Sequence, residues 1–384
     1  MVKFKDICSK IGSGATPKGG KEAYCEEGIS LIRSQNVLDF AFSADGLAFI
    51  NNLQAEKLKN VIVEEGDVLL NITGDSVARA CMVDKKYLPA RVNQHVCIVR
   101  ADPQKAVPSY LLHFLQLNKE YLLQLASGGA TRNALTKEMI NNLELELPSI
   151  EEQQKLVAIL DDIQARMDCN NAINENLEQQ AKAIYQQMFI ENTNPDWVEG
   201  SLRDIADITM GQSPSGSSYN EDGIGTIFFQ GRAEFSFRFP TIRLYTTEPK
   251  RMACTNDILM SVRAPVGDLN IAHTDCCIGR GLAAIHSKTN HQSFMLYTMF
   301  SLKKQLDVFN GEGTVFGSIN RNSLNDMPIL IPSDETIEEF ERIVAPMDAA
   351  IRNNYDEICR LQAVRDSLLP RLMSGELDVA EIDI

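Results

Sequence analysis

Residues 156–188 read LVAILDDIQARMDCNNAINENLEQQAKAIYQQM. Leu156, Leu160 and Ile163 begin a series of positions separated by alternating steps of four and three. This spacing is the a/d seam of a coiled coil, and it is kept over about four heptads. The stretch therefore predicts one long helix with a single row of side chains facing a partner. That row is Leu156, Leu160, Ile163, Met167, Asn170, Asn174, Leu177, Ala181, Ile184 and Met188.

A second seam in the same frame lies near the end of the chain, at Phe340, Val344, Met347, Ile351, Asn354, Ile358, Leu361, Arg365, Leu368 and Leu372. Two such helices can pair with each other, and the pattern alone allows parallel or antiparallel pairing. Asn170 and Asn354 fall near the middle of the seams. They are either a buried pair that fixes the register or solvent-facing residues where the helices separate. Pro346 marks either a kink or a late start of the second helix.

The sequence ahead of each helix is also present twice. Residues 66–70 (GDVLL) return as residues 256–260 (NDILM), and residues 14–17 (GATP) return as 211–214 (GQSP). Such internal similarity has to be interpreted before any single motif. Two copies favour a molecule with pseudo-twofold symmetry, and a twofold that exchanges the halves makes antiparallel pairing of the long helices the consistent choice.

These patterns predict an α+β chain of four segments. Two globular modules of mixed α/β structure, residues 1–148 and 201–332, alternate with two helical segments, residues 149–200 and 333–384. Short strands are expected in both modules, for example at 29–32, 67–72, 95–99, 226–229 and 257–262. A helix is expected in each module, from Ser109 as N-cap to Ala126 and from Ser293 to Phe309.

The net charge of −15 is unevenly placed. Residues 149–200 carry −7 and residues 333–384 carry −8, so both globular modules are neutral. Local charge decides where an anionic ligand can bind. The acidic helices are suited to a protein partner, whereas the neutral modules can still present arginines on one face.

Other site classes find no support in the sequence. The nine cysteines include no Cys-x-x-Cys pair and no Cys/His spacing that fits zinc, so they are expected to be reduced core residues. Residues 14–21 (GATPKGGK) fail the phosphate-loop pattern, because that pattern requires Ser or Thr where Glu22 stands. The first residues lack the apolar core of a signal peptide and no run is long enough to span a membrane, so a cytoplasmic protein is expected.

The motifs resemble those of a known family, the specificity subunits of type I restriction–modification systems. The run LPSIEEQQKLVAIL (147–160) is similar to the opening of the family's first conserved helical region, and LLPRLMSGEL (368–377) is similar to the end of its second. GDVLLNITG (66–74) and NDILMSVRAPVG (256–267) are similar to the signature within its recognition domains. The likeness covers the whole chain, although the second helix lacks the Glu-Gln pair of the family pattern.

The resemblance implies a non-catalytic subunit that reads double-stranded DNA. Each module would be a target recognition domain for one half of a bipartite target, and the helices would set the gap between the halves. They would also dock two methyltransferase subunits carrying S-adenosylmethionine and, in some systems, ATP-driven motor–nuclease subunits. The helix positions expected to hold this assembly together are Leu156, Leu160, Ile163, Asn170, Leu177, Ile184, Met347, Ile351, Asn354, Ile358, Leu361 and Leu368. No cofactor is expected on this chain.

The repeat also selects candidate DNA-contacting residues. Polar residues that lie at matching loop positions but differ in type can read two different sequences, since Arg recognises guanine and Asn or Gln recognises adenine. The first module offers Thr16, Lys18, Arg33, Gln35, Asn36, Thr73, Ser76, Arg79, Asn93, Gln94, Arg132 and Asn133, and the second offers Ser213, Gln230, Arg232, Arg263, Arg280, Phe316, Asn320 and Arg321. The alternative is a protein scaffold that uses the same helices without reading DNA.

Overall fold

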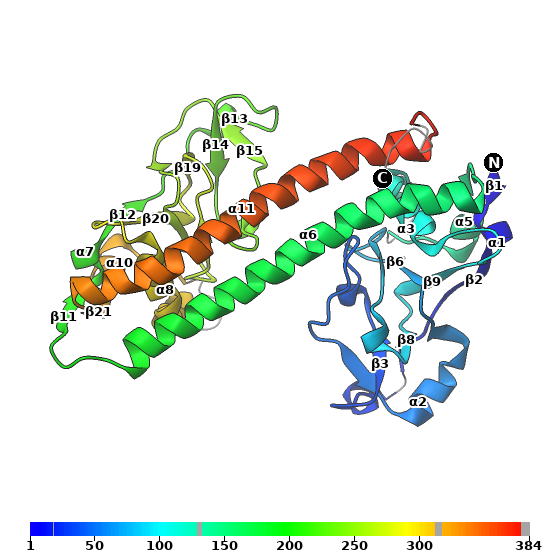
Figure 1. Cartoon of the computed structure of the whole chain (residues 1–384), viewed down its shortest axis with the longest axis horizontal. Coiled ribbons are helices and arrows are strands. Elements are labelled where there is room, and N and C mark those ends of the chain that lie inside the picture. The colour runs from blue at the N-terminus through cyan, green and yellow to red at the C-terminus, as the bar shows by residue number, and fades with distance from the viewer. Residues whose placement is uncertain (18, 129–132, 312–316, 378–384) are drawn as a thin grey trace. The chain divides into compact units, whose positions relative to one another are not determined.

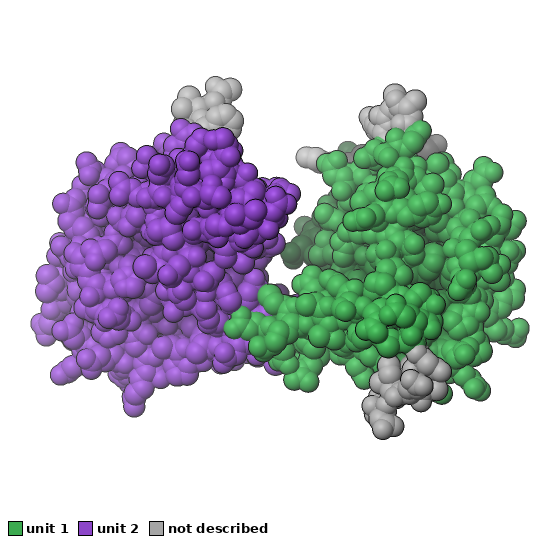
Figure 2. Space-filling view, turned by 90° about the horizontal axis from the view of Figure 1, so that it is seen from above, with its two compact units in different colours: residues 1–170, 356–384 green, residues 171–355 purple. Residues whose placement is uncertain are grey.

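The computed structural model describes residues 1–17, 19–128, 133–311 and 317–377. These residues form two compact units (Figure 2). Unit 1 comprises residues 1–170 and the described residues from 356 onward, and unit 2 comprises residues 171–355. Each unit therefore combines one globular module with one length of each long helix.

The first module contains two four-stranded sheets (Figure 1). The sheet β2-β9-β6-β7 is antiparallel throughout, and the sheet β4-β3-β8-β5 contains one parallel pair, β3 with β8. A short antiparallel pair, β1 with β10, joins the two ends of the module. The strands are β1 (Val2–Lys3), β2 (Cys8–Ser13), β3 (Ile29–Ile32), β4 (Ala48–Ile50), β5 (Ile62–Val63), β6 (Val68–Asn71), β7 (Ala80–Met82), β8 (Ala90–Val92), β9 (Val96–Ala101) and β10 (Glu144–Leu145).

The second module has the same strand order. The sheet β12-β20-β17-β18 repeats the first sheet, and β15-β14-β19-β16 repeats the second, with β13 added beside β15. The parallel pair recurs as β14 with β19, and the joining pair recurs as β11 with β21. The strands are β11 (Val198–Ser201), β12 (Ala206–Met210), β13 (Tyr219–Asn220), β14 (Thr226–Phe229), β15 (Leu244–Thr246), β16 (Met252–Ala253), β17 (Ile258–Ser261), β18 (Leu269–Ile271), β19 (Cys276–Ile278), β20 (Leu282–Ser287) and β21 (Pro328–Ile331).

The repeated GDVLL motif forms the strand that is buried on both faces. In β6, Val68 and Leu70 face one hydrophobic core while Leu69 faces another, because successive side chains of a strand point to opposite sides. β17 repeats this alternation between two cores of the second module. A strand covered on both faces requires an unbroken apolar run, and this requirement explains why the motif shows no polar alternation.

The turn that precedes β6 and β17 explains the first two residues of the repeated motif. Gly66 and Asn256 both have positive φ, 85° and 72°, a conformation that Gly adopts freely and Asn tolerates. The buried carboxylate of Asp67 accepts a hydrogen bond from the backbone of Glu64, and Asp257 accepts one from Cys254. The motif therefore specifies a backbone turn, whose polar groups are satisfied inside the module.

Short helices pack on the sheets close to their predicted places. The prediction of one helix from Ser109 to Ala126 was wrong in detail: α3 ends at Leu117, and α4 begins at Lys119 after the cap residue Asn118. Ser109 is also not the N-cap, because Pro108 occupies the first turn and Val107 precedes it. The helices are α1 (Phe4–Ile7), α2 (Asn52–Lys57), α3 (Pro108–Leu117), α4 (Lys119–Ser127), α5 (Lys137–Asn141), α7 (Leu202–Ile205), α8 (Gln292–Ser301), α9 (Lys303–Asp307) and α10 (Arg321–Asn325).

The two long helices are α6 (Ile150–Tyr185), which continues as a π-helical segment from Gln186 to Glu191, and α11 (Asp334–Met373). No predicted seam position is exposed on either helix. The late start proposed for the second helix was wrong, since α11 begins at Asp334 and runs through Pro346. Within the described residues, no helix combines the length and apolar character needed to cross a membrane.

The two long helices contact each other within each unit. In unit 1, Arg365 donates to Gln164 and Asn170 donates to Glu357, so residue numbers rise along α6 as they fall along α11. In unit 2, Asn354 donates to the buried Asn174 at 2.8 Å. Both seam asparagines are thus hydrogen-bonded across the helices, although Asn170 and Asn354 do not pair with each other.

Candidate nucleic-acid interface

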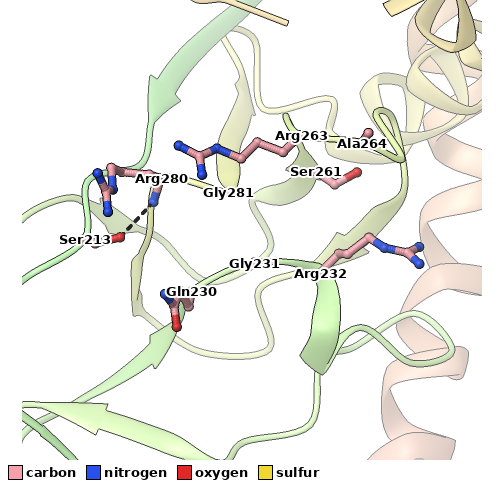
Figure 3. A pocket seen from close by; sticks show the side chains of 9 residues that line it. All are labelled: Ser213, Gln230, Gly231, Arg232, Ser261, Arg263, Ala264, Arg280 and Gly281. Carbon is pink, nitrogen blue, oxygen red and sulfur yellow. Dashed lines mark hydrogen bonds between the residues drawn. The ribbon is translucent and has the colours of Figure 1, made fainter. Parts of the chain in front are cut away.

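In the second module, loops that follow several strands meet around one hollow of about 220 Å³ (Figure 3). The loops come from the ends of β12, β14 and β17 and from the turn between β19 and β20. They bring together five of the predicted residues, which lie far apart in the sequence: Ser213, Gln230, Arg232, Arg263 and Arg280.

Glycines allow these loops to approach one another. A Cβ atom on Gly211 would overlap the carbonyl group of Gly279, and a Cβ on Gly279 would lie 2.7 Å from the carbonyl oxygen of Gln230. A Cβ on Gly281 would lie 2.9 Å from the same oxygen. The hollow therefore depends on backbone contacts that only residues without a side chain permit.

Substituting one of these glycines tests this packing. Gly211→Ala is expected to lower the free energy of unfolding by about 1–3 kcal/mol, because the methyl group forces two backbones apart. Urea unfolding followed by the fluorescence of Trp197, the only tryptophan in the chain, reports on unit 2. Gly216→Ala is the matched control, since nothing lies within 4 Å of a Cβ there. Equal effects of the two substitutions would contradict the role of Gly211.

The three arginines at the hollow differ in their partners. Arg263 and Arg280 are exposed, and their guanidinium groups form no hydrogen bond or ion pair within the described residues. Arg232 is held by an ion pair with Asp268. Figure 3 shows Arg263 and Arg280 on one side of the hollow, with the side chain of Arg232 directed away from them. Arg263 and Arg280 thus line the same hollow as Gln230, whose side-chain amide also has no partner among the described residues.

The first module places the corresponding loops together. A Cβ on Gly14 would overlap the carbonyl group of Val92, so the loop after β2 touches the turn between β8 and β9, as in the second module. Thr16 donates a hydrogen bond to the side chain of Gln94. At the corresponding contact of the second module, the Ser213 hydroxyl accepts a hydrogen bond from the Arg280 backbone at 3.2 Å. The repeat therefore extends from the strands to the contacts between the loops.

A polar chain continues from this contact to the end of β6. The side chain of Gln94 lies 3.1 Å from Nε2 of His95, and Nδ1 of His95 lies 2.5 Å from the hydroxyl of Thr73. His95 is not among the predicted DNA contacts, although it belongs to the same loop as Asn93 and Gln94, which are. Its position directly beside Gln94 at the turn was the available signal.

Two predicted DNA contacts of the first module have structural roles instead. Asn36 is fully buried, and its amide donates to the backbone oxygens of Ser43 and Asp45. Asn93 is also buried, and its side-chain oxygen accepts a hydrogen bond from the His95 backbone at 2.9 Å. Both asparagines shape loops, as their preference for turns allows.

Arg33 and Gln35 lie on the same loop as Asn36. Arg33 donates to the Gly46 carbonyl at 2.5 Å, and Gln35 reaches the carbonyls of Asp45 and Gly46 at 3.3 and 3.4 Å. Gln35 is exposed, whereas Arg33 is half-buried. These side chains therefore brace the loop, and Gln35 presents the more accessible amide.

The remaining predicted residues are spread around the loops. Ser76 and Arg79 are half-buried in the turn after β6, and Asn133 is exposed with its carbonyl bonded to the Gly74 backbone. In the second module, Asn320 caps α10 through a 2.9 Å bond to Ser323, and Arg321 is exposed. Lys18, Arg132 and Phe316 lie outside the described residues.

A buried ionic network joins the second module to both long helices, and sequence reasoning missed it. The guanidinium of Arg238 lies 3.0 Å from Asp348 of α11, 2.9 Å from the hydroxyl of Tyr297 and 3.7 Å from Glu178 of α6. Burial raises the pKa of Asp348, and the charge of Arg238 opposes this shift. An Arg is normally exposed, so sequence reasoning did not expect Arg238 to be buried, although Phe237 and Phe239 stand on either side of it.

No group of three or more His, Cys, Asp or Glu side chains in the described part of the chain could hold a metal ion. All nine cysteines are free thiols. Burial raises the pKa of several of them, including Cys81 and Cys97, to about 12, so these thiols are not activated nucleophiles.

Comparison with known proteins identifies the chain's relatives. A family model described as the type I restriction modification DNA specificity domain matches residues 1–179 and 194–359. A putative type I restriction enzyme specificity subunit, MjaX of Methanocaldococcus jannaschii, is 28% identical over 98% of this chain and 93% of its own length. The type I restriction enzyme HindI specificity subunit of Haemophilus influenzae is 21% identical over 91% and 94%.

A solved structure supports the fold. The type I restriction–modification system S subunit of M. genitalium superposes with a TM-score of 0.60 over 97% of this chain and 95% of its own, at 14% identity.

Proposed function

The chain belongs to the type I restriction–modification DNA specificity family, and from that premise we propose that each of its two modules reads one half of a bipartite DNA sequence. Its function is DNA sequence recognition, as in the specificity subunits to which it is similar. The domain limits proposed are residues 1–148 and 201–332 for the recognition domains, and 149–200 and 333–384 for the helical spacers.

One observation carries the division into two reading sites. In both modules, polar side chains from loops distant in sequence are brought to the ends of the same strands, with the same contacts between loops but different residue types. Common strands with different polar side chains are what two readers of different sequences require. The neutral charge of the modules, beside acidic helices, supports placing the DNA on the loops.

The long helices are proposed to pair as an antiparallel coiled coil with pseudo-twofold symmetry. The pairing of Asn174 with Asn354 and of Asn170 with Glu357 supports this register. If a twofold exchanges the two halves, the pair Asn174–Asn354 falls within one residue of the pair Asn170–Glu357. A polar contact in an apolar seam fixes register at some cost in stability. The pair of helices would then set the length of DNA left unread between the two halves.

The chain is proposed to have no catalytic site of its own. Two methyltransferase subunits would supply S-adenosylmethionine and methylate the target, and motor–nuclease subunits with ATP could join them. The helices offer the proposed docking surface, because their outer faces are exposed and acidic. Within this chain, the described loops supply only hydrogen-bond donors, acceptors and positive charge to the DNA.

Mapping methylated bases across the genome tests the proposal. Cells with the methyltransferase subunits are expected to show methylation at a split target when this chain is present and none at that target when it is deleted. A scaffold that does not read DNA would leave the pattern of methylated sequences unchanged on deletion. That outcome would reject the reading function and favour the scaffold.

A further inference from the structure

We infer that the hollow of the second module reads guanine, with Arg263 and Arg280 each contacting one guanine base. The inference rests on the proposed function, since it concerns which bases the second half-site contains. It also distinguishes the two modules, because the first module has Thr73 and Gln94, and no arginine, at the two corresponding positions.

The two guanidinium groups are available while their backbones are fixed. Arg263 lies in a backbone bridge with Ser318, and the backbone N–H of Arg280 is bound by Ser213. The neighbouring Gly279 donates to the Phe229 carbonyl at 2.8 Å. Beyond the backbone, both side chains are exposed and have no partner among the described residues. A donor on a fixed loop loses less conformational freedom on binding than one on a mobile loop.

The chemistry of the hollow fits a guanine edge. Guanine presents two neighbouring acceptors in the major groove, N7 and O6, and the planar fork of an Arg donates to both. Among the described residues, no acidic side chain lines the hollow, so none of them neutralises either arginine there. The uncommitted amide of Gln230 lies beside them (Figure 3), and an amide both donates and accepts, as base edges do.

The third arginine of the hollow is excluded from this role. Arg232 pairs with Asp268, and Lys303 lies 3.5 Å from the same carboxylate. Its charge is thereby compensated within the protein. Two guanine contacts are therefore expected at the hollow, one from Arg263 and one from Arg280.

The first module differs at the two decisive positions. Thr73 forms the backbone bridge that corresponds to the one at Arg263, and Gln94 makes the loop contact that corresponds to the one at Arg280. Both side chains are bonded within the module. The same scaffold thus presents guanidinium groups in one half and neutral polar groups in the other, so guanine reading by this pair belongs to the second half-site.

Selection from a pool of DNA duplexes with a randomised core tests the inference. The full chain, bound to the methyltransferase subunits of its system, is expected to enrich a split sequence with two guanines in the half read by residues 201–332. Arg263→Gln is expected to relax the preference at one guanine by about 5- to 150-fold, and Arg280→Gln at the other. Neither variant should change the other half of the sequence.

Controls separate base reading from attraction to phosphate. Arg342→Gln removes the same charge from the exposed surface of α11 and is expected to relax no position. If the two hollow variants weaken binding to all sequences equally and reduce the salt dependence by about one phosphate contact each, the arginines bind phosphate and the inference is wrong. A second half-site without guanine would also overturn it, with the reading function intact. Failure of the unaltered complex to enrich any sequence would reject the function itself.

Trp197 fluorescence verifies that each variant is folded before selection. Both arginines are exposed and have no side-chain partner in the described part of the chain, so their replacement is expected to leave the urea unfolding midpoint unchanged.

Discussion

Arg238→Met is expected to lower the free energy of unfolding reported by Trp197 by about 3–5 kcal/mol. The substitution leaves Asp348 without the cation that compensates it inside the protein, whereas Glu178 keeps its ion pair with Lys182. An uncompensated charge in the interior is among the most destabilising changes known. Arg203→Met is the matched control. That arginine also pairs with a carboxylate, Asp326, but the two side chains are 52% and 60% exposed, so a cost of no more than about 1 kcal/mol is expected.

Two further measurements separate lost charge compensation from lost packing. Adding Asp348→Asn to Arg238→Met is expected to recover part of the loss, because it removes the carboxylate left unpaired. The loss should also depend on pH. Burial raises the pKa of Asp348 above its ordinary 3.8, so the folded state binds the proton more tightly than the unfolded state. Stability then falls as pH rises from that value, and without Arg238 it falls further.

The cost of Arg238→Met should therefore be smaller near pH 4 than near pH 7. A cost independent of pH, with no recovery in the double variant, would show that Arg238 acts through packing alone.

Phe340→Ala is expected to lower the same free energy by about 3–5 kcal/mol, because it opens a cavity in a closed aromatic cluster. Phe340 is completely buried, and its ring centroid lies 5.3 Å from that of Phe189, 5.7 Å from that of Tyr185 and 5.9 Å from that of Tyr297. These rings belong to both long helices and to the module. Within unit 2, Phe340 thus holds α11 against the second module and α6.

Ile343→Ala on the same helix is the control. Its side chain is 40% exposed, and a change within about 0.5 kcal/mol is expected. Urea unfolding followed at Trp197 measures both variants. If Phe340→Ala costs no more than Ile343→Ala, the aromatic cluster does not hold the helix on the module.

The sequence predicted the fold best where burial alone determines the type of residue. The central strand of each module is buried on both faces, so its apolar run, for example Val68 to Leu70, could be assigned without knowing its neighbours. Apolar residues at heptad spacing, such as Leu156 and Leu160 of α6, were expected to be buried for the same reason, and both are buried. The pairing of the two rows as one coiled coil stays a prediction.

The candidate site was less accessible to prediction because polar residues serve several roles. Asn36 and Gln35 are adjacent and chemically alike, yet one is buried as a loop brace and the other is exposed. Arg232 and Arg263 lie in similar loops, yet Arg232 has an acidic partner 36 residues away, whereas Arg263 has none within the described ranges. Such differences depend on contacts between distant segments, which a local pattern does not contain.

The internal repeat nevertheless made part of the candidate site predictable. Comparing the two copies indicated which loops carry polar residues of different type, and in the second module five of those residues do surround one hollow. It could not indicate Arg238, because the two copies hold their helices by different contacts: His113 bonds to Asp161 in unit 1, where Tyr297 bonds to Asp348 in unit 2.

Exchange of one module tests the division of labour most directly. Residues 201–332 are replaced by the corresponding module of another specificity subunit, and methylated bases are mapped in cells with the methyltransferase subunits. One half of the target sequence is expected to change to the half read by the donor module, while the other half and its methylation are retained. A change in both halves, or in neither, would contradict the claim that each module reads its own half.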